Sequence, residues 1–294
     1  MFDLRYHVAS LAAVFLALII GILVGAGLAA RTDVEGTERR VLEERIAELQ
    51  QNGEDLSAEA DLLRRQRDAI DVYVNETYDV VMNGRLRATR VAVLFVGQSD
   101  DGLLEAIEQT LEAASAPSLV ELEALELPIV AEEVAAALEP EYTDLSLEEV
   151  GRRLGEELVE GGETPFWDTL IPVFVQDHRG TPSVEADAVV VSHTAVASDM
   201  PTRQLLDGIY AGLEQSRVPV VGVERITERP SRIAVYKANG LSSVDSVDTE
   251  IGKVALAALL AGGPEGHYGL KETAESGTLP VPIEPLSLAP LPGG

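Results

Sequence analysis

The sequence of 294 residues contains no cysteine, and this absence excludes several kinds of site. A disulfide framework, a Cys-ligated zinc or iron–sulfur centre and a cysteine nucleophile all require thiol groups. Histidine and methionine are also scarce, with 4 and 3 residues. The chain therefore offers few of the side chains that build metal centres.

Basic residues are the second shortage. Only 22 Lys and Arg face 50 Asp and Glu, which gives a formal net charge of −28. A nucleic-acid partner is therefore excluded, because binding phosphates requires a basic surface. The charge is uneven: residues 1–31 carry +1, residues 32–79 carry −8 and residues 80–294 carry −21. The apolar fraction of 46 % excludes a chain that is disordered throughout.

Motifs of nucleotide-binding and hydrolytic enzymes are missing as well. Neither G-x-G-x-x-G nor G-x-x-x-x-G-K-[ST] occurs, and the turn 97–102 carries two acids that would repel a phosphate. Ser192 and His193 are adjacent and Asp199 follows, but no G-x-S-x-G elbow is present. We therefore expect no enzymatic activity; an enzyme that uses the distal part of the chain is the least favoured alternative.

One long apolar run is present near the amino terminus, after a tail of seven residues. Residues 8–30 include no charge, and 23 residues at about 1.5 Å each can cross a bilayer core of about 30 Å. We predict a transmembrane helix. A cleaved signal peptide is the alternative, since Gly27-Leu28-Ala29 resembles a cleavage site, although signal cores are usually about 7 to 15 residues long.

Small residues recur at every fourth position of this predicted helix. Gly21 and Gly25 form a G-x-x-x-G pair within the row Ala9, Ala13, Ala17, Gly21, Gly25 and Ala29. Such a stripe favours close packing of membrane helices. The alternative is that alanine and glycine are simply common in membrane helices.

A heptad pattern follows in residues 32–80, which contain no proline. Apolar residues occur at an unbroken spacing of seven, at Leu42, Leu49, Leu56, Leu63 and Ile70. This row predicts a coiled coil, which together with the small-residue stripe favours a homodimer. Gly53 is its weakest position, because glycine costs about 1 kcal/mol inside a helix. The alternative is a single amphipathic helix that lies on its own globular domain.

The distal region, residues 88–272, alternates between short β-branched runs and helical patterns. Strands are predicted over 90–96, 186–191 and 218–223 and helices over 103–114, 201–215 and 248–260, with a further strand over 232–235. This alternation predicts an α/β class, Rossmann-like domain with a mostly parallel sheet.

Residues 117–187 have a less regular pattern and are interpreted as an insertion or lid. They are predicted to hold helices over 126–138 and 147–159 and an edge strand over 170–175, where Pro172 cannot donate to a central ladder. Residues 273–294 are predicted to form a disordered, proline-rich tail.

Three strings resemble one known family. They are Leu4-Arg5 followed by SLAAVFLAL at 10–18, the segment SVDSVDT at 243–249, and Gly266-His267-Tyr268-Gly269. With the order of anchor, coiled coil and α/β domain, they resemble the actinobacterial family named for the copper transport outer membrane protein MctB, which includes the cell-division factor SteB. The resemblance covers residues 1–272.

The resemblance implies an envelope protein linked to copper transport or homeostasis, or alternatively a regulator of cell-wall hydrolysis at division that acts through its coiled coil. A pore needs a closed barrel or several spanning helices, and one predicted span supplies neither. We therefore expect a dimeric binding or scaffold protein with an envelope or membrane partner protein. The resemblance implies no catalytic or cofactor-binding residues.

Copper is implied by the resemblance alone. Cu(I) favours thiolate and thioether ligands, of which the distal region has only Met82 and Met200. A site that combines His178, His193 and Met200 is conceivable, and His267 is a further candidate, but no ligand spacing supports them. Segments 243–249 and 266–269 also have structural interpretations: Asp248 or Thr249 can cap the helix that follows, and His267 and Tyr268 can pack on the sheet.

Only weak signals in the sequence indicate on which side of the membrane the bulk of the chain lies. Counting basic residues near the span places the bulk of the chain in the cytoplasm, but only Arg31 lies at the boundary and long domains translocate largely regardless of charge. We expect a single-pass membrane protein whose bulk lies on the extracytoplasmic side.

Overall fold

The computed structural model describes residues 4–117, 119–180, 184–195 and 199–281, with the side chains of residues 4, 5 and 29–38 outside this description. The chain divides into two compact units, residues 1–71 and 72–294, each of which is considered by itself. The helix α1 (Leu4–Met82) begins in the first unit and ends in the second.

The described residues of the first unit, 4–71, all belong to α1. Its segment Tyr6–Leu28 has a mean hydropathy of 2.8 and none of it is buried, so by length and composition it can cross a membrane. The predicted apolar helix is therefore confirmed, while the pairing of helices predicted for the heptads stays a prediction. The Pro-free sequence explains why no break separates the span from the heptads.

The second unit is built on a seven-stranded sheet with the order β3-β2-β1-β4-β5-β6-β7. All neighbouring strands are parallel except β3, which is antiparallel to β2. The predicted mostly parallel α/β domain is confirmed. The strands are β1 (Val91–Val96), β2 (Glu121–Leu125), β3 (Val175–Gly180), β4 (Ala188–His193), β5 (Val220–Val223), β6 (Ser242–Val244) and β7 (His267–Tyr268).

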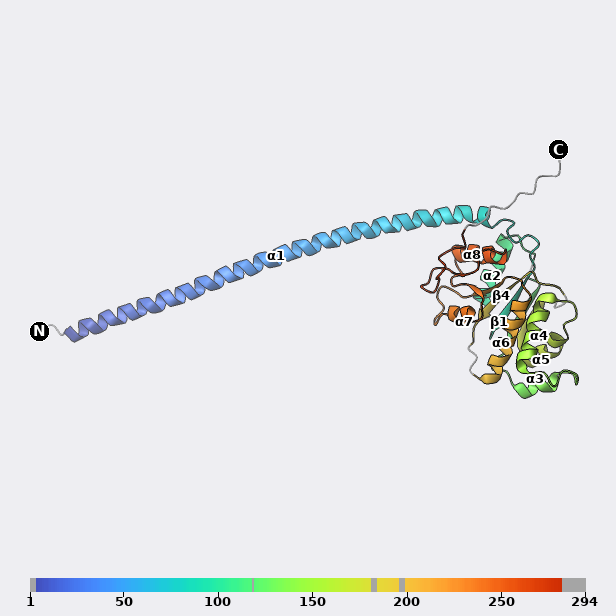
Figure 1. The fold of residues 1–294 in the computed structure, drawn as a ribbon. Coiled ribbons are helices and arrows are strands. Elements are labelled where there is room, and N and C mark those ends of the chain that lie inside the picture. Colours follow the sequence, from blue (N-terminus) through green and yellow to red (C-terminus); the bar gives the residue numbers. More distant parts are fainter. Residues whose placement is uncertain (1–3, 118, 181–183, 196–198, 282–294) are drawn as a thin grey trace, which may run out of the picture. The chain divides into compact units, whose positions relative to one another are not determined.

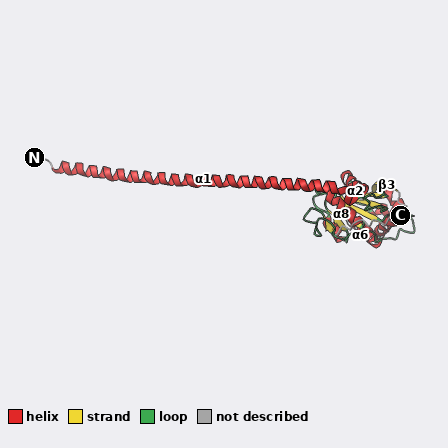
Figure 2. Ribbon diagram, turned by 90° about the horizontal axis from the view of Figure 1, so that it is seen from above, coloured by secondary structure: helices red, strands yellow, loops and turns green. Residues whose placement is uncertain are grey.

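Helices cover both faces of this sheet (Figure 1). The last turns of α1 share one apolar core with α2 and α8, and the five other helices share the core on the opposite face. Figure 2 shows the strands enclosed by these helices. The helices are α2 (Asp101–Ala113), α3 (Ala131–Ala137), α4 (Leu147–Glu160), α5 (Pro165–Phe174), α6 (Met200–Gln215), α7 (Ile233–Ala238) and α8 (Glu250–Leu260).

The helices α4 and α6 meet along a seam of glycines. Gly151 and Gly155 on α4 face Gly208 and Gly212 on α6, and a Cβ at any of the four would lie 2.0, 2.3, 2.1 and 2.2 Å, respectively, from a backbone oxygen of the other helix. The two G-x-x-x-G pairs therefore bring the helix backbones into contact. No bulkier residue fits at these positions without separating the helices.

Two predicted strands are wrong. Residues 170–175 lie mostly in α5, which begins with Pro165 at its first position and buries Phe166, Trp167, Leu170 and Phe174 at helical spacing. Residues 232–235 lead into α7, whose Ile233 and Tyr236 are buried. In both cases a short apolar run was compatible with either period.

The described residues within 117–187 contribute to the sheet and to its covering layer, so the predicted insertion or lid is wrong. They supply β2 and the edge strand β3, and α3, α4 and α5 between them. At the other edge, residues 273–281 of the predicted tail are described: the Thr273 hydroxyl donates to Asp245 and Leu279 packs on the core. The remainder of the predicted tail, 282–294, lies outside the described residues.

Candidate functional site

The carboxyl ends of β1 and β4 mark the point where the strand order reverses, which is where open α/β sheets bind ligands. The loops that leave these two strands are packed against each other. Thr194 donates to the carbonyl oxygen of Gln98 over 2.6 Å, and a Cβ on Gly97 would lie 2.6 Å from that of Ala195. The crevice directly between the two strands is thus filled by the chain itself.

The amino terminus of α2 beside this crevice is capped internally. The Asp100 carboxylate accepts from the backbone N–H of Leu103 at 2.9 Å and from the Arg225 guanidinium at 2.7 Å. A phosphate at this helix end would have to displace a carboxylate that already uses the exposed N–H and a neighbouring cation. The observation agrees with the absence of nucleotide-binding motifs.

A cavity of about 200 Å³ lies beside the end of β4, bounded by residues of α6 and α7. Its lining combines polar and apolar residues and comprises His193, Ala195, Arg203, Leu206, Asp207, Tyr210, Arg232, Val235 and Asn239. We take this cavity, called the His193 pocket below, as the candidate functional site of the α/β domain. It lies at the carboxyl edge of the sheet, where the fold favours ligand binding.

His193 lines the pocket as a neutral imidazole. The residue is 7 % exposed, and burial lowers its pKa to about 4, with the nearby Arg232 acting in the same direction. Its Nε2 contacts the hydroxyl of Tyr210, and its backbone N–H donates to the hydroxyl of Tyr236 at 3.0 Å. The Tyr236 hydroxyl in turn donates to the carbonyl oxygen of Val223 at 2.9 Å. Two tyrosines on α6 and α7 thereby hold the histidine in place.

Two arginines complete the pocket. Arg203 is exposed on α6, and Arg232, half-buried, comes directly before α7. Among the residues that the structure describes, neither guanidinium forms an ion pair, and the Nε of Arg232 is buried without a hydrogen-bond partner. Asp207 is the single acid of the lining. The pocket therefore has a formal charge of +1 in a chain of −28.

A second cluster of titratable groups lies on β2 and β3, at one edge of the sheet. Glu121 and Glu123 are 1 % and 0 % exposed on the same face of β2, and three of their four carboxyl oxygens lack a partner among the described residues. The fourth lies 2.5 Å from Nδ1 of His178 on β3. Burial raises the pKa of both carboxyl groups.

Glu157 connects two helices near this cluster. Its carboxylate accepts from the backbone N–H groups of Phe166 and Trp167 at 3.1 Å, so a side chain of α4 caps α5. The indole N–H of Trp167 donates back to the carbonyl oxygen of Leu154 at 2.9 Å. Burial raises the pKa of Glu157 to about 7, against the opposing effect of these N–H groups.

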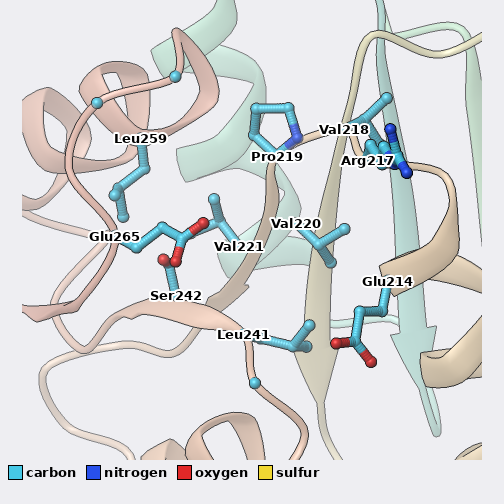
Figure 3. A pocket seen from close by; sticks show the side chains of 13 residues that line it. Glu214, Arg217, Val218, Pro219, Val220, Val221, Leu241, Ser242, Leu259 and Glu265 are labelled. Carbon is cyan, nitrogen blue, oxygen red and sulfur yellow. The ribbon is translucent and has the colours of Figure 1, made fainter.

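A larger cavity of about 420 Å³ lies at the amino ends of β5 and β6. Figure 3 shows the carboxylates of Glu214 and Glu265 among apolar side chains such as Val220, Leu241 and Leu259. Open α/β sheets bind ligands at the carboxyl ends of their strands. We therefore keep the His193 pocket as the candidate functional site, although it is the smaller of the two cavities.

Polar side chains of the string SVDSVDT at 243–249 form hydrogen bonds that stabilise the β6–β7 edge of the sheet and the start of α8. The buried Asp245 accepts from the backbone N–H of Leu270 at 2.8 Å and from that of Lys271. Asp248 accepts from the backbone N–H of Ile226, and the Thr249 hydroxyl caps α8 at Gly252. The predicted cap at the start of this helix is confirmed, with Thr249 as the capping residue.

The four proposed metal ligands are placed apart from one another. His178 is on the edge strand β3, His193 is on the central β4, and His267 is on β7 at the other edge. Met200 begins α6 and is 60 % exposed. Within the described residues, no three His, Cys, Asp or Glu side chains are arranged to hold a metal ion. His267 instead contacts the hydroxyl of Ser243 through Nδ1 at 2.9 Å.

The helix-pairing residues predicted from the sequence are all on α1, in the first unit. Gly21 and Gly25 have open space where a Cβ would lie. The heptad residues are between 57 % and 68 % exposed, at Leu42, Leu49, Leu56, Leu63 and Ile70. In a single chain this row of large apolar side chains has no partner among the described residues.

Comparison with known proteins supports one family over nearly the whole chain. Residues 1–279 match the family described as "Copper transport outer membrane protein, MctB". Proteins named "Copper transporter MctB" from Mycobacterium bovis and Mycobacterium tuberculosis are 25 % identical over 335 aligned residues, which cover 95 % of this chain and 99 % of each relative. The chain therefore belongs to the MctB family of copper transport outer membrane proteins.

Proposed function

We propose that this chain acts in copper transport or homeostasis as a membrane-anchored, dimeric binding or scaffold protein. One helix anchors it, two copies pair along α1, and the α/β domain contacts a partner protein of the envelope. It forms no pore by itself, because a single spanning helix leaves no lumen. The proposed role requires no catalytic chemistry.

The exposed heptad row is the observation that supports this proposal. Five large apolar side chains at a spacing of seven would lie in water if α1 were unpaired. A coiled coil with a second copy buries them, since the same row then meets itself. The open G-x-x-x-G positions in the apolar segment offer a second contact between the same two helices.

Disulfide cross-linking in membranes tests the pairing, and the absence of native cysteine makes the readout specific. We expect Leu49→Cys to form a disulfide-linked dimer, because this position lies on the predicted seam. Gln51→Cys, two residues away on the outer face of the helix, is the matched control and should stay monomeric on a non-reducing gel. Both positions are exposed in the single chain, so neither change affects folding.

Two results would count against the proposal. Equal cross-linking at positions 49 and 51 would indicate random collision, and no cross-linking at 49 would exclude a parallel homodimer with this seam. If the dimer is found, affinity capture with and without residues 32–80 then identifies the partner protein that the stalk helps to bind.

A further inference from the structure

We propose that the His193 pocket binds a small oxyanion, that is, a ligand whose recognised group is a phosphate or a carboxylate. The site is separate from the paired helix of the proposed function. It lies between the end of β4 and the helices α6 and α7, and it uses residues that are far apart in the sequence.

The volume of the pocket limits the class of ligand. Sites for drug-sized ligands and cofactors usually measure about 300 to 1,000 Å³. At about 200 Å³, the His193 pocket is too small for a nucleotide. It accommodates a group of a few non-hydrogen atoms, either as a free ion or as the charged end of a longer molecule that extends into solvent.

The charge of the pocket sets the sign of the ligand. Arg203 and Arg232 both line it, and neither forms an ion pair with another described residue. Other arginines of the domain do so, as Arg90 with Asp187 at 2.9 Å and Arg225 with Asp100 at 2.7 Å. Arg203 interacts with Asp199, whose pKa it helps to lower, but forms no ion pair with it. In a chain with more than twice as many acids as bases, two cations beside one cavity, neither of them in an ion pair with a described residue, favour an external anion as their partner.

Arg232 supplies the strongest single contact to such a ligand. Its buried Nε has no hydrogen-bond partner, and an unsatisfied buried donor is costly. A guanidinium fork matches the geometry of carboxylate and phosphate oxygens. An oxyanion in the pocket would pair with the guanidinium of Arg232 and neutralise its charge.

The remaining lining is compatible with an anion. The ring of His193 is neutral and held by Tyr210, so it neither attracts nor repels the ligand by charge. Leu206 and Val235 provide an apolar side that reduces the local dielectric constant and strengthens the pairing. Asp207 is exposed, so its repulsion is screened by solvent.

Calorimetric titration of the full-length protein in phosphatidylcholine nanodiscs tests the proposal, with inorganic phosphate and malonate as the two probes. We expect at least one probe to bind saturably at one site per chain. Arg232→Gln should weaken that binding about tenfold or more, which corresponds to about 1.4 kcal/mol. Arg232→Lys should retain part of the affinity, because it keeps the charge without the fork.

Two further variants make the experiment decisive. Arg203→Gln changes an exposed side chain, so it removes a pocket cation without disturbing the packing, and it should also weaken binding. Arg217→Gln, an exposed arginine at the amino edge of the sheet, is the matched control and should bind as the unaltered chain does.

The probe that binds identifies the chemical class of the ligand. Saturable binding of phosphate alone indicates a phosphorylated ligand, and binding of malonate alone indicates a carboxylate. The proposal is overturned if neither probe binds saturably, or if binding survives both Arg232→Gln and Arg203→Gln unchanged.

Discussion

Glu121 and Glu123 make the stability of the domain depend on pH at the scale of single residues. Burial raises the pKa of both in the folded state, so folding favours their protonated forms. Their contribution to stability is complete below the unfolded pKa of about 4.3 and is lost as pH rises through the higher folded values. The folded domain is therefore penalised by this pair under alkaline conditions.

We expect Glu121→Gln to stabilise the protein above about pH 8, because the amide removes a buried charge that lies beside the carboxyl group of Glu123. A gain on the order of 1 kcal/mol corresponds to a rise of about 2–4 °C in Tm for a domain of this size. Thermal unfolding at acid and alkaline pH measures the effect, which should vanish near pH 4. The exposed Glu108→Gln is the control, and a lower Tm for Glu121→Gln at alkaline pH would contradict the assignment.

Asp245 is the residue on which the β7 edge depends. Its carboxylate receives two backbone N–H groups and the hydroxyl of Thr273, and the side chain is fully buried. Asp245→Ala should lower the free energy of unfolding by about 2–4 kcal/mol, since buried donors lose an ionised acceptor. Chemical denaturation measures the loss, with the exposed Asp144→Ala as control. A change within the error of the control would show that water replaces the carboxylate.

The His193 pocket shows what the sequence could predict of the site. His193 was identifiable because it stands at the carboxyl end of a buried, valine-rich strand, where polar residues meet ligands. Arg203 and Arg232 were not, since 28 residues separate them and only the turn into α7 brings Arg232 near His193. That turn falls in a segment whose apolar run was compatible with a strand.

At the scale of elements, we expect the same Gly→Ala substitution to have opposite effects in the glycine seam and in α1. Gly208→Ala should destabilise the domain by about 1–3 kcal/mol, because its Cβ would lie 2.1 Å from the carbonyl oxygen of Glu148 and force α4 and α6 apart. Gly53→Ala should stabilise α1 by about 1 kcal/mol, because nothing lies within 4 Å of its Cβ.

Circular dichroism during thermal unfolding measures both changes in the same full-length protein. A neutral Gly208→Ala would mean that the two helices can separate without loss of packing. A destabilising Gly53→Ala would mean that the second helix of the proposed coiled coil approaches this position so closely that a methyl group does not fit.

Elements were predictable where burial and propensity agreed. The strands β1, β4 and β5 are short runs rich in valine that are buried on both faces, and these were found. The sequence pattern does not predict β2, because Glu121 and Glu123 occupy buried positions on one of its faces, where apolar residues are expected. The edge strand β3 is polar and mostly exposed, so it carries no burial signal.

At the scale of the whole molecule, the side of the membrane decides which partners the α/β domain can meet. Glu112→Cys places the chain's single thiol on the exposed surface of α2. If the domain is extracytoplasmic, a membrane-impermeant maleimide should label this variant in intact cells. Labelling only after permeabilisation would place the domain in the cytoplasm and exclude the envelope partner proposed above. The unaltered chain controls for reaction at other groups.

The contact between α4 and α6 also has a consequence for dynamics. Without a layer of side chains between them, neither helix can open while the other stays folded, and the cap from Glu157 extends this coupling to α5. When the exchange rate of each amide is divided by its intrinsic rate, the buried amides of the three helices should therefore show one common free energy of opening. Trp167, the only tryptophan of the chain, is fully buried in this layer, so its fluorescence is a built-in reporter of that opening.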